Sequence, residues 1–273
     1  MDHFYITLPS NSSEAYYGKQ PMCNFKTRLA KPIQLPVDEW EVGLAEIIYP
    51  HTWKNVTDGD FRIKVFGKDG WVWEDVKIPS ALYSSPAKLI EEMERVAKAK
   101  MTKGTLGNIH LHYNELLHKI AIHLAPGYMI YLPRPMAMIL GFGDVSSVTL
   151  EHHREEDELN YGVTVLESAV FYNNSKIVPP FCVDLSRGMH TFFIYCNIVA
   201  YQLVGDTNVP LMRTIPVTGR NGEVVVNSFD NVHYMGLGRS DFQEVEVHIT
   251  DDTGRDVPFE QGRVIVKLHF RKK

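Results

Sequence analysis

Apolar and polar residues alternate with a period of two through both ends of the chain. In the segment 39–49, one face carries four apolar side chains and one acid: Trp40, Val42, Leu44, Ile48 and Glu46. Alternation over this length is typical of a strand with one face against a core. We therefore expect Trp40 to be buried, and Glu46 and Ile48 to face the same core.

Eight strands of this kind are predicted outside the middle of the chain. They lie near residues 4–8, 23–29, 39–49, 162–172, 191–203, 211–217 (or its hairpin partner 223–226), 242–250 and 263–270. The segment 191–203 is apolar on both faces, which indicates a central strand with a bulge at Asn197. Short strands without regular strand–helix alternation favour a β-sandwich, and eight strands in two sheets make a jelly roll.

Strand pairing follows from this fold class. The first and last core strands of a jelly roll are neighbours, so we expect 23–29 to pair antiparallel with 263–270. By the same reasoning, 39–49 is expected to pair with 242–250. The segment "TRLAKPIQLP", with Pro32 and Pro36, indicates an irregular edge beside the sandwich.

The middle of the chain has a different pattern. Two hairpins, one turning at 68–70 and one spanning 108–124, flank the helix "SSPAKLIEEMERVAKAKM", which Ser85 caps and Pro86 begins. A short helix is predicted to start at Pro135. The expected fold is mainly β: a single jelly-roll β-sandwich with an inserted small α+β unit. Its predicted parts are 1–54 and 161–273 for the jelly roll and 55–160 for the insert.

Composition excludes several classes of protein. The 273 residues are 44% hydrophobic and 22% charged with a net charge of −5, a globular composition that does not favour binding a polyanion, so no specific nucleic-acid partner is expected. The three cysteines, Cys23, Cys182 and Cys196, lie in apolar, strand-like surroundings without metal-ligand spacing. No signal peptide or membrane span is evident, so we expect a soluble intracellular protein with no membrane partner.

The most tempting chemistry is "GTLGNIHLHYNE". His110 and His112 share one face of a strand with Glu115 just beyond, and this resembles the first metal-binding motif of cupins. No second motif follows, and the two histidines lie opposite the apolar residues of their strand, as on a solvated face. His152-His153 in the acidic segment 150–160 is also interpreted as solvated charge.

Other motifs predict structure rather than chemistry. Asp251-Asp252 before Gly254 is typical of a tight turn, because an Asp side chain bonds nearby backbone N–H groups. No nucleophile motif and no phosphate-binding glycine loop occurs. We therefore predict no catalytic, cofactor or metal site, no cofactor, and no enzyme activity.

Three long phrases resemble one family. They are "WEVGLAEIIYP" (40–50), "YCNIVAYQLVGDTNVPLMRTIPV" (195–217) and "EVHITDDTGRDVPFEQGRVIVKLHF" (246–270), and "IPSALYSSPAKLIEEM" and "MILGF" extend the likeness into the insert. The family is the penton-like minor capsid protein of Polinton (Maverick) elements and adintoviruses. The resemblance implies a single jelly roll that forms pentamers at the vertices of an icosahedral capsid.

The resemblance also implies partners and a location. The partners are four further copies of the chain and a double jelly-roll major capsid protein, and the location is the virion, after synthesis in the host cytoplasm or nucleus. The Trp40 strand would be a core strand, with Glu46 and Tyr49-Pro50 where it leaves the sandwich toward the insert. Two alternatives stay open: a cupin-like metal-binding enzyme, and a lectin-like jelly-roll binding module.

Overall fold

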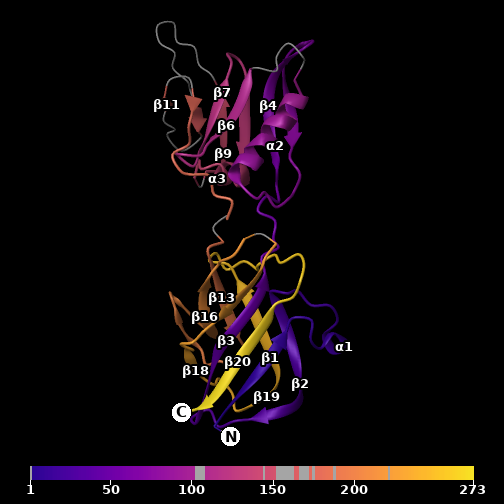
Figure 1. The fold of residues 1–273 in the computed structure, drawn as a ribbon. Helices are drawn as coiled ribbons and strands as arrows, with labels where there is room; N and C mark the ends of the chain where they lie inside the picture. The colour runs from indigo at the N-terminus through magenta and orange to yellow at the C-terminus, as the bar shows by residue number, and fades with distance from the viewer. Residues whose placement is uncertain are drawn as a thin grey trace. The chain divides into compact units, whose positions relative to one another are not determined.

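The computed structural model describes residues 2–101, 108–143, 145–151, 163–165, 172–173, 176–186, 189–220 and 222–273. They form two units, each with its own hydrophobic core (Figure 1). Unit 1 comprises Met1–Trp53 and Gly188–Lys273, and unit 2 comprises Lys54–Arg187. The chain thus leaves unit 1 once, builds unit 2, and returns.

Unit 1 is a sandwich of two antiparallel sheets. In chain order its eight main strands are β1 (His3–Pro9), β2 (Asn24–Gln34), β3 (Trp40–Pro50), β13 (Thr191–Cys196), β16 (Leu211–Pro216), β17 (Val224–Ser228), β19 (Asp241–Thr250) and β20 (Ile265–Lys272). One sheet has the order β1-β20-β3-β17, with β18 (Tyr234–Gly236) also paired to β3, and the other has the order β16-β13-β19-β2. This is the strand order of a jelly roll, so the predicted fold class is confirmed.

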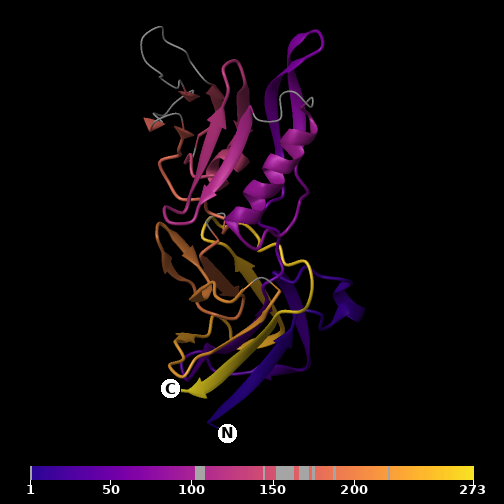
Figure 2. The ribbon, with the colours of Figure 1, turned by 45° about the horizontal axis from the view of Figure 1, so that its top comes forward.

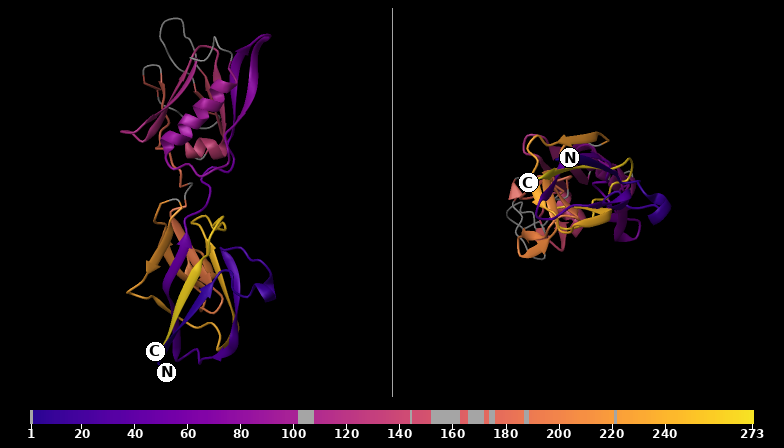
Figure 3. Two further views of the ribbon diagram at one scale, coloured as in Figure 1. Left: turned by 45° about the vertical axis from the view of Figure 1, so that its right-hand side comes forward. Right: turned by 90° about the horizontal axis from the view of Figure 1, so that it is seen from below.

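Smaller elements decorate the sandwich. The helix α1 (Glu14–Tyr17) lies in the connection between β1 and β2, and the hairpin β14 (Gln202–Val204) and β15 (Thr207–Val209) follows β13. The two chain ends lie together at one end of unit 1 (Figure 3), because β1 and β20 pair in a register that sets His3 opposite Arg271.

One predicted jelly-roll strand belongs elsewhere. The described part of the segment 162–172 includes β10 (Val163–Val165), which pairs with β9 of unit 2, and the unit boundaries fall at 53/54 and 187/188. Alternation predicts that a strand has a buried face but does not say which core receives it. The two alternatives 211–217 and 223–226 both form strands, so the total of eight is nevertheless correct. In chain order, unit 2 lies between β3 and β13.

The predicted pairings are wrong by one strand. The strand β2 pairs with β19 rather than with the C-terminal strand, and β3 pairs with β20 rather than with β19. The first strand of the roll is β1, which pairs with β20 on its other side. The expected scheme took β2 as the first strand of the roll. It therefore assigned the partner of β1 to β2 and the partner of β2 to β3.

A bulge in β3 explains the acid in its apolar pattern. The register with β20 shifts so that Leu44 pairs with Leu268 while Glu46 pairs with Lys267, which leaves Ala45 extra. One extra residue reverses the phase of the alternation. Trp40, Val42 and Leu44 are buried as predicted, but Ile47 and Tyr49 continue the buried face. The prediction that Glu46 and Ile48 face the core is therefore wrong, and Glu46 accepts a hydrogen bond from Ser228 Oγ at 3.0 Å.

Tyr49 closes the end of β3 in the core. Its ring is fully buried and meets Phe192 edge-on at 5.1 Å between centroids. Its hydroxyl accepts a hydrogen bond from the backbone N–H of Thr218 at 3.1 Å, so burial does not leave the oxygen without a partner. This side chain therefore joins the end of β3 to the loop that precedes β17.

The central strand β13 is shorter than predicted. It lies between β16 and β19, as a central strand should, but it ends at Cys196 rather than at Leu203. Asn197 ends it, because its side-chain oxygen accepts the hydrogen bond of the Glu246 N–H at 3.0 Å, where a continuing strand would offer a backbone carbonyl.

Unit 2 contains two further antiparallel sheets. One has the order β10, β9 (Ser147–Glu151), β8 (Met129–Pro133), β4 (Asp60–Gly67) and β5 (Gly70–Lys77); the other has the order β11 (Tyr172–Asn173), β12 (Lys176–Ile177), β7 (Lys119–Leu124) and β6 (Ile109–Asn114). The helices are α2 (Pro86–Ala99), which packs against β6, and α3 (Arg134–Ile139) (Figure 2). Both predicted hairpins and the long helix are confirmed, and Ser85 Oγ caps α2 by accepting from Lys88 N–H at 3.3 Å.

Candidate assembly surface

The residues of the cupin-like motif do not converge on one point. His110 and His112 lie on the exposed face of β6, while Ile109 and Leu111 on its other face are buried. His110 Nδ1 is 3.0 Å from Glu94 Oε1 of α2, and Glu115 is exposed in the β6–β7 turn. Within the described part of the chain, no group of three or more His, Cys, Asp or Glu side chains is placed to hold a metal ion. His152 and His153 lie outside the described residues.

The Asp251 turn has the structural role predicted for it. Asp251 Oδ1 accepts hydrogen bonds from the backbone N–H groups of Thr253 at 2.8 Å and Arg255 at 3.0 Å. Arg255 also pairs with Oδ2 at 3.0 Å. Burial would raise the pKa of Asp251, but the hydrogen bonds from Thr253 and Arg255 and the charge of Arg255 outweigh burial and lower it. Asp251 is therefore an ionised anchor of the loop before β20.

The thiols give no sign of a nucleophile in the core. Cys23 and Cys196 are buried, and burial raises the pKa of both, that of Cys196 to about 12. A thiol with a raised pKa is mostly protonated and unreactive near neutral pH. Cys182 is exposed in a loop of unit 2, which differs from the strand-like surroundings predicted for it.

The first of two distinctive surfaces on unit 1 is formed by β1, β2 and α1, and we call it edge one. Arg28 of β2 lies over the Tyr16 ring at 4.9 Å, and its backbone N–H donates to Ser13 Oγ at 2.9 Å. Lys26 is paired with Glu246 of β19 at 3.4 Å. Beside Pro32 the β2–β19 register shifts, so the irregular edge predicted from the prolines of this segment is present.

Aromatic and charged side chains extend edge one over the outer face of its sheet. Tyr5 stacks on His269 at 4.3 Å, and Tyr234 Oη is 2.7 Å from His269 Nδ1. Arg271 lies over the Tyr234 ring at 3.5 Å and pairs with Glu41. Burial lowers the pKa of His269, and the nearby charges of His3 and Arg271 lower it further.

The second surface is formed by β16, β17 and the β14–β15 hairpin, and we call it edge two. Its exposed apolar side chains are Tyr201 (67%), Leu203 (82%), Val224 (67%) and Val226 (56%). Among the described residues, β17 pairs only with β3, so its second side is open. An open strand with exposed β-branched residues readily joins another chain. The run of three valines at 224–226 is the sequence signal for this edge, because an apolar run in a two-faced strand must expose some of its members.

The two edges lie on opposite sides of the sandwich. In one sheet β1 and β17 are the outermost main strands, and in the other β2 and β16 are. Each molecule therefore carries two unlike surfaces, one aromatic and charged, the other mainly aliphatic. Contact between unlike surfaces of two copies is heterologous, and repeated contacts of this kind close into a ring when the rotation allows.

Comparison with known proteins finds likeness in structure alone. No protein-family profile and no curated protein matches the sequence. The crystal structure of the mavirus penton protein matches with a TM-score of 0.52 and 12% identity, over 100% of both chains. A chain of the Sputnik virophage cryo-EM structure matches with a TM-score of 0.52 and 11% identity, over 100% of this chain and 98% of that one. The likeness shows a shared fold that includes both units.

The described residues also bear on membrane insertion. None of their helices is both long and apolar enough to cross a bilayer.

Proposed function

We propose that this chain is a structural capsid protein that forms the vertex, or penton, of an icosahedral virion. The observation that carries the proposal is the single jelly roll with a unit inserted between its third and fourth strands, a fold similar over its full length to the mavirus penton protein. The phrases of the sequence that resemble the Polinton and adintovirus family support an origin in such a DNA element, with a double jelly-roll major capsid protein as the neighbour in the shell.

The two edges of unit 1 suit a ring of five. A vertex has fivefold symmetry, so its subunit must offer one surface to the copy before it and a different surface to the copy after it. We assign these roles to edge one and edge two. The valines of edge two would pack against the aromatic side chains of edge one, which leaves the ion pairs of Lys26 and Arg271 at the rim, where charged residues are common in interfaces.

A catalytic function has less support. A cupin-like site needs a third ligand beside His110 and His112, yet His110 bonds Glu94 and Glu115 lies in a turn. We therefore propose a role in assembly rather than in chemistry.

Native mass spectrometry across a range of concentrations tests the ring. We expect a species of five copies, 5 × 31.2 kDa or about 156 kDa. If ring contacts are too weak in the free protein, co-expression with the major capsid protein should place the chain at the fivefold vertices of particles seen by cryo-EM. A stable dimer or trimer incompatible with fivefold packing would contradict the proposal.

Charge substitutions on edge two test which surface closes the ring. Val224→Asp with Val226→Asp should reduce the pentamer at least tenfold without lowering the melting temperature, because both side chains are exposed in the monomer. Leu116→Asp, which changes an exposed apolar residue of unit 2, is the matched control and should leave the pentamer intact. Loss of the pentamer on chelation with EDTA would instead revive the metal-site alternative.

A further inference from the structure

The β4–β5 hairpin of unit 2 carries an exposed group of aromatic side chains, and it extends past neighbouring strands (Figure 2). Phe66, Trp71 and Trp73 are 51%, 42% and 39% exposed. Trp71 packs edge-on against Phe66 at 5.3 Å and against Tyr128 at 5.0 Å between ring centroids. The rings are therefore held in place by one another although part of each is exposed. Exposed apolar side chains that gather in one place are typical of interaction sites.

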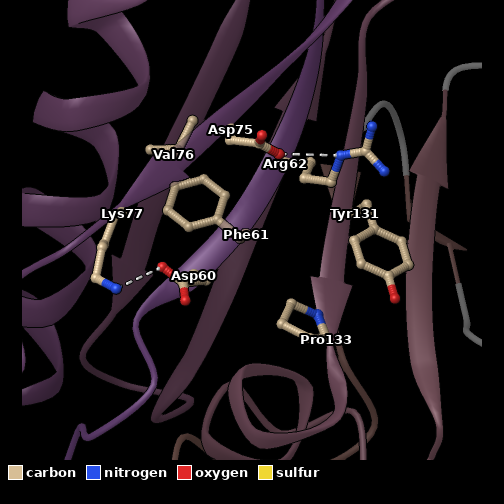
Figure 4. A pocket seen from close by; sticks show the side chains of 8 residues that line it. All are labelled: Asp60, Phe61, Arg62, Asp75, Val76, Lys77, Tyr131 and Pro133. Atoms are coloured by element: carbon tan, nitrogen blue, oxygen red, sulfur yellow. Dashed lines mark ion pairs between the residues drawn. The ribbon is translucent and has the colours of Figure 1, made fainter.

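A hollow of about 490 Å³ lies on the same sheet (Figure 4). It is lined by Asp60, Phe61, Arg62, Asp75, Val76, Lys77, Tyr131 and Pro133. Volumes of this order are typical of small-molecule sites. The strand register sets Arg62 of β4 between Asp75 of β5 and Tyr131 of β8, so three strands contribute to one floor.

The charges of the hollow cancel in pairs. Arg62 Nε is 3.2 Å from Asp75 Oδ1, and Lys77 Nζ is 3.3 Å from Asp60 Oδ1. All four side chains are about half exposed or more, and exposed ion pairs contribute little to stability. Each group can therefore exchange its partner for a ligand hydroxyl at small cost. The hollow offers hydrogen-bond donors and acceptors side by side with no net charge.

Arg62 joins the hollow to the exposed rings. Its guanidinium lies 5.2 Å from the centroid of the Trp73 ring, while Tyr131 lies on its other side in the sheet. An aromatic ring thus lies on each side of Arg62 in the sheet, Trp73 at the border of the hollow and Tyr131 within its lining. A sugar presents the matching chemistry: a face of C–H groups that packs on an aromatic ring, and a rim of hydroxyls that both donate and accept hydrogen bonds.

We propose that this hollow binds an uncharged saccharide. A phosphorylated or sulfated ligand would meet the carboxylates of Asp60 and Asp75 beside Arg62 and Lys77, so the hollow offers an anion no net attraction. An apolar protein segment would bury four charged groups. These groups would lose their hydrogen bonds to water and gain none in return, which is costly. The saccharide site is independent of the vertex role of unit 1 and gives unit 2 a function of its own, recognition of a glycan.

The first test is binding of the purified full chain to a glycan array that contains neutral oligosaccharides of hexoses, N-acetylhexosamines, pentoses and fucose, with sialylated and sulfated glycans beside them. We expect binding to at least one neutral oligosaccharide. Isothermal titration with that oligosaccharide should then show at least a tenfold loss of affinity for Trp73→Ala and about a threefold loss for Asp75→Asn. Phe181→Ala, which removes another exposed ring of unit 2 outside the hollow, should bind as the unchanged chain does.

Three outcomes would overturn the proposal: no neutral oligosaccharide is bound, only anionic glycans are bound, or binding is unaffected by both Trp73→Ala and Asp75→Asn. Melting curves establish that each variant is folded, and Asp75, whose side chain is 92% exposed, can be changed without disturbing the core. The same variants are examined for the pentamer. Loss of saccharide binding with an intact pentamer concerns this site alone, whereas absence of the pentamer with intact saccharide binding concerns the proposed capsid role alone.

Discussion

Both units build a core between antiparallel strands, but the paired strands are far apart in the sequence in unit 1 and often adjacent in unit 2. In unit 1 neighbouring strands come from distant parts of the chain, as in the pairing of β1 with β20 or β3 with β17. In unit 2 the hairpins β4–β5 and β6–β7 pair strands that follow each other directly. Pairing of strands that are close in sequence loses less loop-closure entropy than pairing of distant strands. An insert built this way can form its own core before the last strand of the jelly roll has paired.

The exposed apolar side chains of the two units differ as well. In unit 1 they are tyrosines and aliphatic residues, and Val224 and Val226 lie at a sheet edge. In unit 2 the exposed Phe66, Trp71 and Trp73 lie together on the β4–β5 hairpin. Aliphatic edges suit a contact that repeats between identical copies, and rings beside paired charges suit a polar ligand. The proposals made above give assembly to unit 1 and recognition to unit 2, and the following four predictions test how independent the units are.

The largest effect is expected from truncation of each core in turn. Trp40→Ala in unit 1 and Ile63→Ala in unit 2 should each cost about 2–5 kcal/mol, because both side chains are buried and a cavity replaces them. Differential scanning calorimetry should show that each variant lowers the transition of its own unit only. Lys26→Ala, on the exposed face of β2, is the control and should change neither. A single transition that both variants shift equally would show that the units unfold as one.

A smaller effect is expected at the Asp251 turn. Asp251→Asn should destabilise unit 1 by about 1–3 kcal/mol at pH 7, since a buried acceptor of several N–H bonds loses its charge. The folded pKa of Asp251 lies below its unfolded value, so its stabilisation is present above about pH 4 and is lost as the pH falls through the folded pKa. Urea denaturation should therefore show the variant and the unchanged chain converging in acid.

The exposed carboxylate of unit 2 provides the contrast. Asp75→Asn changes a side chain that is 92% exposed. We expect it to leave the stability of unit 2 unchanged, both at pH 7 and in acid. Equal losses for both substitutions would mean that the buried turn has no special part in unit 1.

The strands themselves could largely be predicted from the sequence, because alternation reports which residues have a buried face. Their partners could not. The burial of Trp40 says nothing about whether β19 or β20 lies beside it, and the alternation of 162–172 does not reveal which core receives it. The bulge at Ala45 was also hidden, because Glu46 and Ile48 continue the same spacing as the core residues before them.

The candidate surfaces were less predictable for a related reason. Apolar residues are interpreted as buried unless something indicates otherwise, so "GWVWEDV" predicts a strand but not the exposure of Trp71 and Trp73. That exposure depends on β5 being the outermost strand of its sheet, a fact of topology. Val224 and Val226 are exposed because they lie on the outer face of β17, whereas Val225 between them is buried.

A modest effect is expected from removal of single hydroxyls. Tyr49→Phe should cost about 1–2 kcal/mol, because the Thr218 N–H loses its acceptor inside the protein. Tyr83→Phe in unit 2 removes a hydroxyl that donates to the Pro79 carbonyl at 3.1 Å at the surface, and water can replace it, so we expect less than about 0.5 kcal/mol. Equilibrium unfolding in urea measures both. A Tyr49→Phe chain as stable as its parent would show that the loop before β17 is anchored by other contacts.

The smallest effect is expected from His269, and it appears only as pH dependence. Burial together with the charges of His3 and Arg271 lowers its folded pKa below the unfolded value of about 6.5. As the pH falls through this value the unfolded chain binds the proton first, so unit 1 loses stability toward acid until the folded group also titrates. Lys267 faces the same cluster across Tyr5 and Glu41 pairs with Arg271, and neither substitution proposed here changes them. His269→Gln should therefore flatten the stability of unit 1 between pH 7.5 and 5.5, measured by urea denaturation, whereas His110→Gln on the exposed face of β6 should leave that profile unchanged. If both variants retain the full slope, the acid sensitivity of unit 1 lies in other groups than the stacked histidine.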